Sequence, residues 1–102
     1  MNRKEFLKSE IEAYPNDPLN YYMLALEFKK EGQHQLSKDL FDFLIEKNRA
    51  YLPTYYTYGA YLIELGEENI AELILRTGLS LARKSKQEKM AKEIQSLIDL
   101  YF

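Results

Sequence analysis

The sequence predicts an all-α protein built from repeated pairs of helices. Two observations support this: apolar residues recur with helical spacing between breaks at Pro and Gly, and the whole pattern returns after 34 residues. No segment alternates apolar and polar residues for long enough to predict a β-strand. One helix face, with spacing i, i+3, i+4, i+7, consists of Tyr21, Leu24, Ala25 and Phe28.

The expected helices are bounded by recognisable start signals. The pairs Asp17–Pro18 and Leu52–Pro53 place Pro at the first helical position, where its missing N–H costs nothing. Ser85–Glu88 matches a capping box, and Asn2–Glu5 is a weaker version of it. The helices are expected near residues 3–13, 18–31, 35–47, 53–65, 69–83 and 86–100.

The stop signals carry the repeat. Gly32 and Gly66 lie 34 residues apart, each where a helix must end, and both can adopt the left-handed conformation that closes a last turn. A helix–turn–helix period of this length is typical of a helical solenoid. The shift pairs Tyr21 with Tyr55, Leu24 with Tyr58, Ala25 with Gly59, Phe28 with Leu62, Ser37 with Ala71, and Phe41 with Leu75.

These paired positions resemble the tetratricopeptide repeat (TPR) family, whose pattern combines large, small and aromatic residues. The resemblance covers two full repeats, 18–51 and 52–85, and a half-repeat at 2–15 that ends in the family's Pro at Pro15. It implies a right-handed α-solenoid of antiparallel helix pairs, formed as one domain by residues 1–102.

Two positions depart from the family pattern. Arg49 and Arg83 replace the closing Pro, and Leu44 and Gly78 sit where Ala is usual. We expect these departures to change the spacing of helices rather than the assignment.

The last expected helix, 86–100, leaves the period. Strict register would place Lys89, Lys92, Glu93 and Ser96 in the core, whereas the apolar stripe is Met90, Ile94, Leu97, Ile98 and Tyr101. We expect this helix to cap the last repeat through that stripe, with Lys86, Lys89, Lys92 and Glu93 facing water. Together with Met1, such a cap favours a complete chain.

Composition excludes several classes of protein. The 102 residues, 46% hydrophobic and 29% charged, suit one soluble domain, and the net charge of −2 excludes a bulk polycation made for nucleic acid. There is no Cys, hence no disulfide or thiolate site. The charged start lacks the apolar stretch of a secretory signal, and no apolar run could span a bilayer. We expect a cytoplasmic protein that does not enter membranes.

No residue set predicts chemistry. His34 is the only His and is expected in a turn or at a helix start. Glu67 and Glu68 suit a helix N-terminus, and Asp39 and Asp42 suit a solvated face. The four Gly form no phosphate-binding cluster. We expect no catalytic residue, no metal, no cofactor and no enzymatic activity.

The resemblance implies a concave groove that holds a peptide or a partner helix, lined by the first helix of each repeat. Its positions fall on Tyr22, Leu26 and Lys29 in the first repeat and on Tyr56, Ala60 and Ile63 in the second, with Lys30 and Lys84 near a basic rim. Some family members clamp a C-terminal carboxylate with Lys and Asn at two of these places. Because neither type stands at the corresponding Tyr22, Leu26, Tyr56 and Ala60, we expect no such clamp.

Two classes of function fit this groove. The protein is either an adaptor that takes a peptide or helix of another protein, or a structural homo-oligomer that binds its own copy through the same surface. A terminal helix of the chain covering the groove is an equally weighted alternative to both. Nucleic-acid or acidic-partner binding through the basic stretch 76–92 comes third, because a solvated face of the cap explains those charges more simply.

Overall fold

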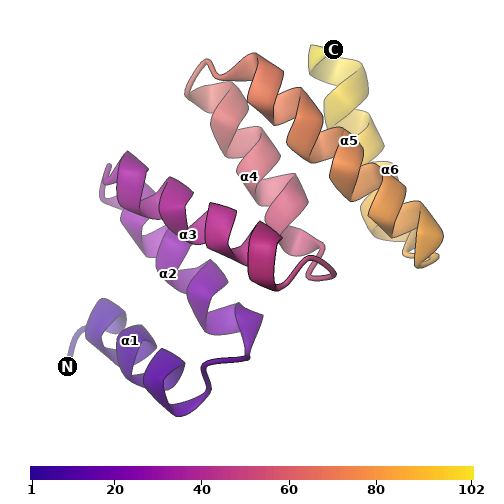
Figure 1. The fold of residues 1–102 in the computed structure, drawn as a ribbon. Helices are drawn as coiled ribbons and strands as arrows, with labels where there is room; N and C mark the ends of the chain where they lie inside the picture. Colours follow the sequence, from indigo (N-terminus) through magenta and orange to yellow (C-terminus); the bar gives the residue numbers. More distant parts are fainter. The chain divides into compact units, whose positions relative to one another are not determined.

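The computed structural model describes all 102 residues and consists of helices joined by short turns, with no strand (Figure 1). The all-α prediction is confirmed, and each helix begins and ends within two residues of its expected bounds. In chain order the six helices are α1 (Arg3–Ala13), α2 (Pro18–Lys30), α3 (His34–Lys47), α4 (Pro53–Glu64), α5 (Glu68–Lys84) and α6 (Glu88–Tyr101).

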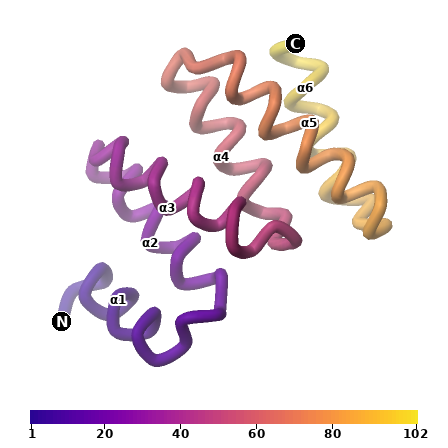
Figure 2. The backbone as a smooth tube through the Cα atoms, in the orientation of Figure 1, coloured from indigo at the N-terminus to yellow at the C-terminus, as the bar shows by residue number.

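The helices form two compact units, Met1–Tyr51 and Leu52–Phe102, each of three helices. In the first unit α2 packs against both α1 and α3, and in the second α5 packs against both α4 and α6, which also touches α4. The backbone trace shows that consecutive helices within a unit fold back on each other through tight turns (Figure 2). Neighbouring helices therefore pair as a helical repeat requires, and the unit boundary coincides with the expected boundary between the repeats.

Side chains cap the first two helices as expected. Asn2 accepts the backbone N–H of Glu5 at 2.8 Å, and its amide donates to the Glu5 carboxylate at 3.3 Å. Asp17 accepts the N–H of Leu19 at 3.0 Å, with Pro18 at the first helical position. Both arrangements supply acceptors to N–H groups that have no partner inside the helix.

Gly32 and Gly66 end α2 and α4 in the left-handed conformation, with φ of +74° and +79°. The N–H of Gln33 then reaches back to the carbonyl of Phe28 at 2.9 Å, and an equivalent hydrogen bond follows Gly66. Both glycines therefore perform the predicted role, since a left-handed residue turns the chain while these bonds satisfy the last carbonyls.

Helix α5 ends in the same way without a glycine. Lys86 has φ of +60°, and the N–H of Gln87 donates to the carbonyl of Ala82 at 2.8 Å. The capping box predicted at Ser85–Glu88 is wrong: the Ser85 hydroxyl closes α5 by donating to a carbonyl of the preceding turn at 2.9 Å. Helix α6 begins only at Glu88 and has no side-chain cap.

The core of the first unit lies between α1, α2 and α3. Leu7, Leu24 and Phe28 form a buried cluster, and the half-buried Leu40 packs against it from α3. Ser37 lies fully buried where α2 and α3 approach most closely, and its hydroxyl donates to the carbonyl of Ala25 at 2.8 Å. That bond satisfies a hydroxyl that would otherwise be costly to bury. Two ion pairs join α1 to α2: Arg3 with Glu27 at 2.7 Å and Lys4 with Glu31 at 2.8 Å.

In the second unit the close approach depends on two glycines. A Cβ on Gly59 of α4 would overlap the Leu75 side chain, and a Cβ on Gly78 of α5 would overlap that of Tyr55. Tyr55 is completely buried as a result. The packing confirms that small residues at these positions admit the neighbouring helix.

The two units solve the same packing problem differently. Position 44 of the first repeat corresponds to 78 of the second and holds a fully buried Leu instead of Gly. Tyr21, the counterpart of Tyr55, is only half-buried; its hydroxyl donates to the Pro15 carbonyl at 2.8 Å and its ring lies 4.8 Å from that of Phe43. A large residue on one helix is thus matched by a displaced aromatic ring on the other, and a glycine by an inserted ring.

Helix α6 covers the second unit with a two-residue shift from strict period. Ile94 and Ile98 lie 36 residues after Tyr58 and Leu62, and all four are buried. The shift follows from α5, which runs to residue 84 whereas α3 ends at residue 47, equivalent to 81. Tyr101, expected in the same stripe, is 53% exposed because the helix ends beyond the surface it covers. The expected capping of the second repeat is otherwise confirmed.

We expect Gly78→Ala to lower the free energy of unfolding by roughly 1–3 kcal/mol, although Ala favours helices, because the new methyl group meets the rigid Cβ of Tyr55. Urea unfolding followed by circular dichroism measures the change. Gly59→Ala should cost less, since the Leu75 side chain can rotate, and Ser80→Ala on the exposed side of α5 serves as the control. Equal stability of Gly78→Ala and wild type would contradict this account of the packing.

We expect Lys86→Gly to raise the free energy of unfolding by about 1 kcal/mol, because glycine adopts the left-handed conformation without the strain that a Cβ imposes. The thermal midpoint reports the gain. As a matched control, Lys89→Gly inside α6 should lose about as much, since glycine weakens a helix interior. A lower midpoint for Lys86→Gly would show that the lysine side chain contributes more than the strain costs.

Candidate interaction surface

The first set of predicted groove residues lies on one face of α2. Tyr22, Leu26 and Lys29 follow the spacing i, i+4, i+7, and each side chain is half-buried. The Tyr22 ring stands edge-on to two others, 6.3 Å from Phe41 and 5.7 Å from Tyr51. These contacts fix the ring while leaving part of it accessible, which is the condition of a preorganised contact residue.

The second set lies on the equivalent face of α4. Tyr56, Ala60 and Ile63 are again half-buried, beside helix positions that are fully buried. The structure thus brings each set of three together on its own helix and gives both sets the same partial exposure. The two sets belong to different compact units.

The lysines assigned to a basic rim are exposed at helix ends. Lys30 is the last residue of α2 and Lys84 the last residue of α5. A cation in the last turn interacts favourably with the negative end of the helix dipole. Their placement is therefore accounted for by helix stability alone.

One phenol in the first unit has a perturbed pKa. Burial raises the pKa of Tyr51 above 10.0, its value in a model compound, and the neighbouring Tyr22 and the Asp17 carboxylate raise it further. All three effects oppose the phenolate, since a charged oxygen loses hydration and faces negative neighbours. Tyr51 therefore stays neutral and keeps its edge-on contact with Tyr22.

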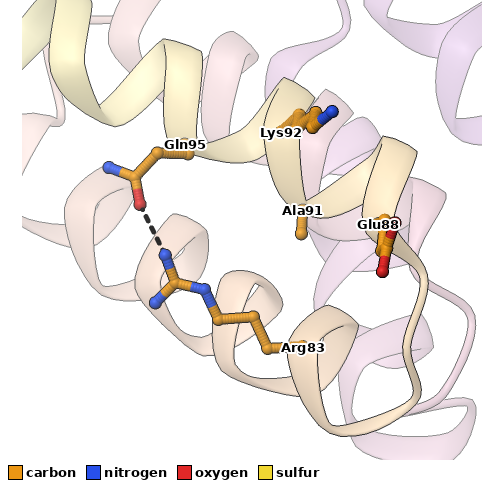
Figure 3. A pocket seen from close by; sticks show the side chains of 5 residues that line it. All are labelled: Arg83, Glu88, Ala91, Lys92 and Gln95. Carbon is orange, nitrogen blue, oxygen red and sulfur yellow. Dashed lines mark hydrogen bonds between the residues drawn. The ribbon is translucent and has the colours of Figure 1, made fainter.

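The sequence gave no warning of a pocket between the end of α5 and α6, which has a volume of about 260 Å³. Figure 3 shows the Arg83 side chain extending from α5 towards α6, where it donates a hydrogen bond to the Gln95 oxygen at 3.0 Å. The Gln95 amide in turn donates to Asp99 at 2.8 Å. The residues lining the pocket are Arg83, Glu88, Ala91, Lys92 and Gln95. Finding it needed the two-residue shift of α6, which the sequence pattern shows only as a broken register.

The basic stretch 76–92 is exposed over most of its length. Arg76, at its start, pairs with Glu72 one turn earlier on α5 at 2.8 Å. Lys86 and Lys89 are exposed around the turn before α6, as a solvated face predicts. Lys92, also exposed, extends away from the Arg83–Gln95 bond (Figure 3).

The remaining titratable residues lie on the surface. His34 is the first residue of α3 and is exposed, as expected for a helix-start residue. No group of three or more His, Cys, Asp or Glu side chains is arranged to hold a metal ion. None of the six helices combines the length and apolar character that crossing a bilayer requires.

We compared the chain with models of protein families, with curated proteins and with solved structures, and none of the three comparisons finds a match. The assignment of helix pairs therefore rests on the 34-residue spacing and on the packing inside each unit.

Above about pH 10 we expect Tyr51 to destabilise the fold. A pKa raised by folding means that the stabilising contribution of the neutral phenol is complete below the unfolded pKa and is lost as the pH rises through the folded one. Tyr51→Phe should therefore lose less stability than wild type between pH 9 and pH 11, measured by urea unfolding. Asp17→Asn, which keeps a capping oxygen but removes the charge, should lower the Tyr51 pKa. Identical pH profiles of wild type and Tyr51→Phe would contradict this assignment.

Proposed function

We propose that the chain is a cytoplasmic, non-enzymatic protein–protein interaction module of the TPR kind. In this proposal its helix pairs belong to a right-handed α-solenoid, and the first helices, α2 and α4, present a Tyr-rich apolar groove to a peptide segment or helix of another protein. No metal or cofactor takes part, and neither membrane nor nucleic acid is the partner.

One observation carries the proposal: the two helices expose the same positions in the same manner. Tyr22 and Tyr56, 34 residues apart, are both half-buried Tyr, and the positions one and two turns later are half-buried in both units. Side chains that served only the core would be buried, and side chains that served only solubility would be exposed and charged. Partial exposure of aromatic and aliphatic groups is typical of contact residues.

The chemistry of these positions indicates an amphipathic partner. A tyrosine offers a large rigid area and a hydroxyl at low cost in conformational entropy. Leu26 and Ile63 add aliphatic surface, and Lys29 adds a cation at the end of the α2 set. A partner helix with apolar anchors and an acidic residue would match this combination.

Self-association through the same surface is the second candidate. Nine Tyr and no Trp suit either kind of contact, and a pair of identical Tyr-rich faces is self-complementary. The two candidates differ in whether the purified chain is a monomer, which light scattering on a sizing column decides.

We expect the double variant Tyr22→Ala/Tyr56→Ala to lose its partner in capture from lysate followed by mass spectrometry, while circular dichroism stays helical. Each truncation removes contact area of a kind that often contributes above 1 kcal/mol. Tyr14→Ala, at an aromatic residue 61% exposed outside the groove, is the matched control and should keep the partner. Unchanged capture by the double variant would refute the adaptor. Loss of a wild-type dimer in the same variant would support self-association instead.

A further inference from the structure

The first and last helices each present a face on which the repeat would place another helix. In the 34-residue register α1 is the second helix of a pair, because Phe6 and Leu7 correspond to Leu40 and Phe41 of α3. Helix α6 is the first helix of a pair, because Ile94 and Ile98 take the places of Tyr58 and Leu62 of α4. One end thus offers a second helix and the other a first helix.

The pocket beside α6 lies where such a second helix would pack. Inside the second unit, Tyr55 and Gly59 of α4 face α5, as their contacts with Gly78 and Leu75 show. The residues 36 positions later are Ala91 and Gln95, and both line the pocket. The pocket is therefore the seat of a missing partner helix rather than an isolated hollow.

The free face of α1 carries the residues to fill that seat. Phe6 is 51% exposed, although Leu40, its counterpart in α3, packs against the buried cluster of the first unit. Glu10 corresponds to the completely buried Leu44. A partner for α1 must therefore offer apolar surface near Phe6 and positive charge near Glu10.

The charges of the two helices are complementary when they run antiparallel, as in the pairs of this fold. After Lys8 the charged residues of α1 are acidic, Glu10 and Glu12, and they would meet the N-terminal half of α6 with Lys89 and Lys92 and the nearby Arg83. The N-terminal half of α1 is mainly basic and would meet Asp99, the sole charge of α6 after Glu93. Phe6 would approach Phe102, which is 41% exposed one turn beyond the buried Ile98. Opposite charges at both ends favour this orientation over the parallel one.

We propose that copies of this chain associate head to tail, with α6 of one copy and α1 of the next forming a helix pair. The interface is heterologous, so each added copy leaves a free α1 face and a free α6 face, and growth ends only where a ring closes. It lies outside the Tyr-rich surfaces of α2 and α4 and stands or falls independently of the adaptor function.

The first test is the mass of the intact chain in solution, by sedimentation velocity and light scattering from micromolar to near-millimolar concentration. Head-to-tail association predicts a weight-average mass that rises with concentration from 12.1 kDa past the dimer, or a closed ring larger than a dimer. A constant 12.1 kDa over the whole range would overturn the proposal, as would a mass that stops at the dimer.

The decisive test uses two variants with opposite blocked ends. Phe6→Asp/Glu10→Arg blocks the α1 face, and Lys92→Glu/Phe102→Asp blocks the α6 face; all four residues are exposed or half-buried, and circular dichroism confirms folding. Each variant alone should remain a monomer, with association weakened at least about tenfold. An equimolar mixture should form a one-to-one dimer through the two intact faces.

A mixture that stays monomeric, or a single variant that still associates like wild type, would refute the interface. Leu73→Asp, at an exposed apolar residue of α5 away from both faces, is the matched control and should associate as wild type does. If it abolishes association as well, the copies meet through a different surface and the proposal fails.

Discussion

Paired helices in this chain approach each other at positions where one of them has almost no side chain, and the remaining packing depends on that approach. Ala25 admits Ser37 in the first unit, and Gly59 and Gly78 admit Leu75 and Tyr55 in the second. The helices, 11 to 17 residues long, are of a length that is marginal in isolation. They are stable because the close contact buries their apolar stripes against a neighbour.

The exchange of Leu44 for Gly78 shows how the same architecture accommodates different side chains. The glycine lets Tyr55 enter the helix interface, whereas the leucine leaves Tyr21 outside it, bonded to Pro15. The next residues on the two helices, Tyr22 and Tyr56, therefore project from differently anchored backbones. Equivalent positions of the candidate surface thus share their exposure but not their supporting contacts.

Much of the fold follows from the sequence because its signals are local. Helical spacing, Pro at helix starts and left-handed Gly at helix ends each involve a few neighbouring residues, and all of these predictions hold. The failures are not local. The capping box at Ser85 failed because α5 extends one more turn and uses that serine to end, an outcome fixed by packing against α6. The pocket at Gln95 depends on the same extension, and the contact of Tyr22 with Tyr51 joins residues 29 positions apart.

The succession of helix contacts has a consequence for the speed of folding. Inside each unit a helix packs mainly on the one that precedes or follows it, so most contacts join residues close in the chain. Little loop entropy is lost before such contacts form, and helical proteins of this kind fold in about microseconds to milliseconds. A newly made chain of this type spends little time with its apolar stripes unprotected, which limits the interval in which they could meet those of another unfolded chain.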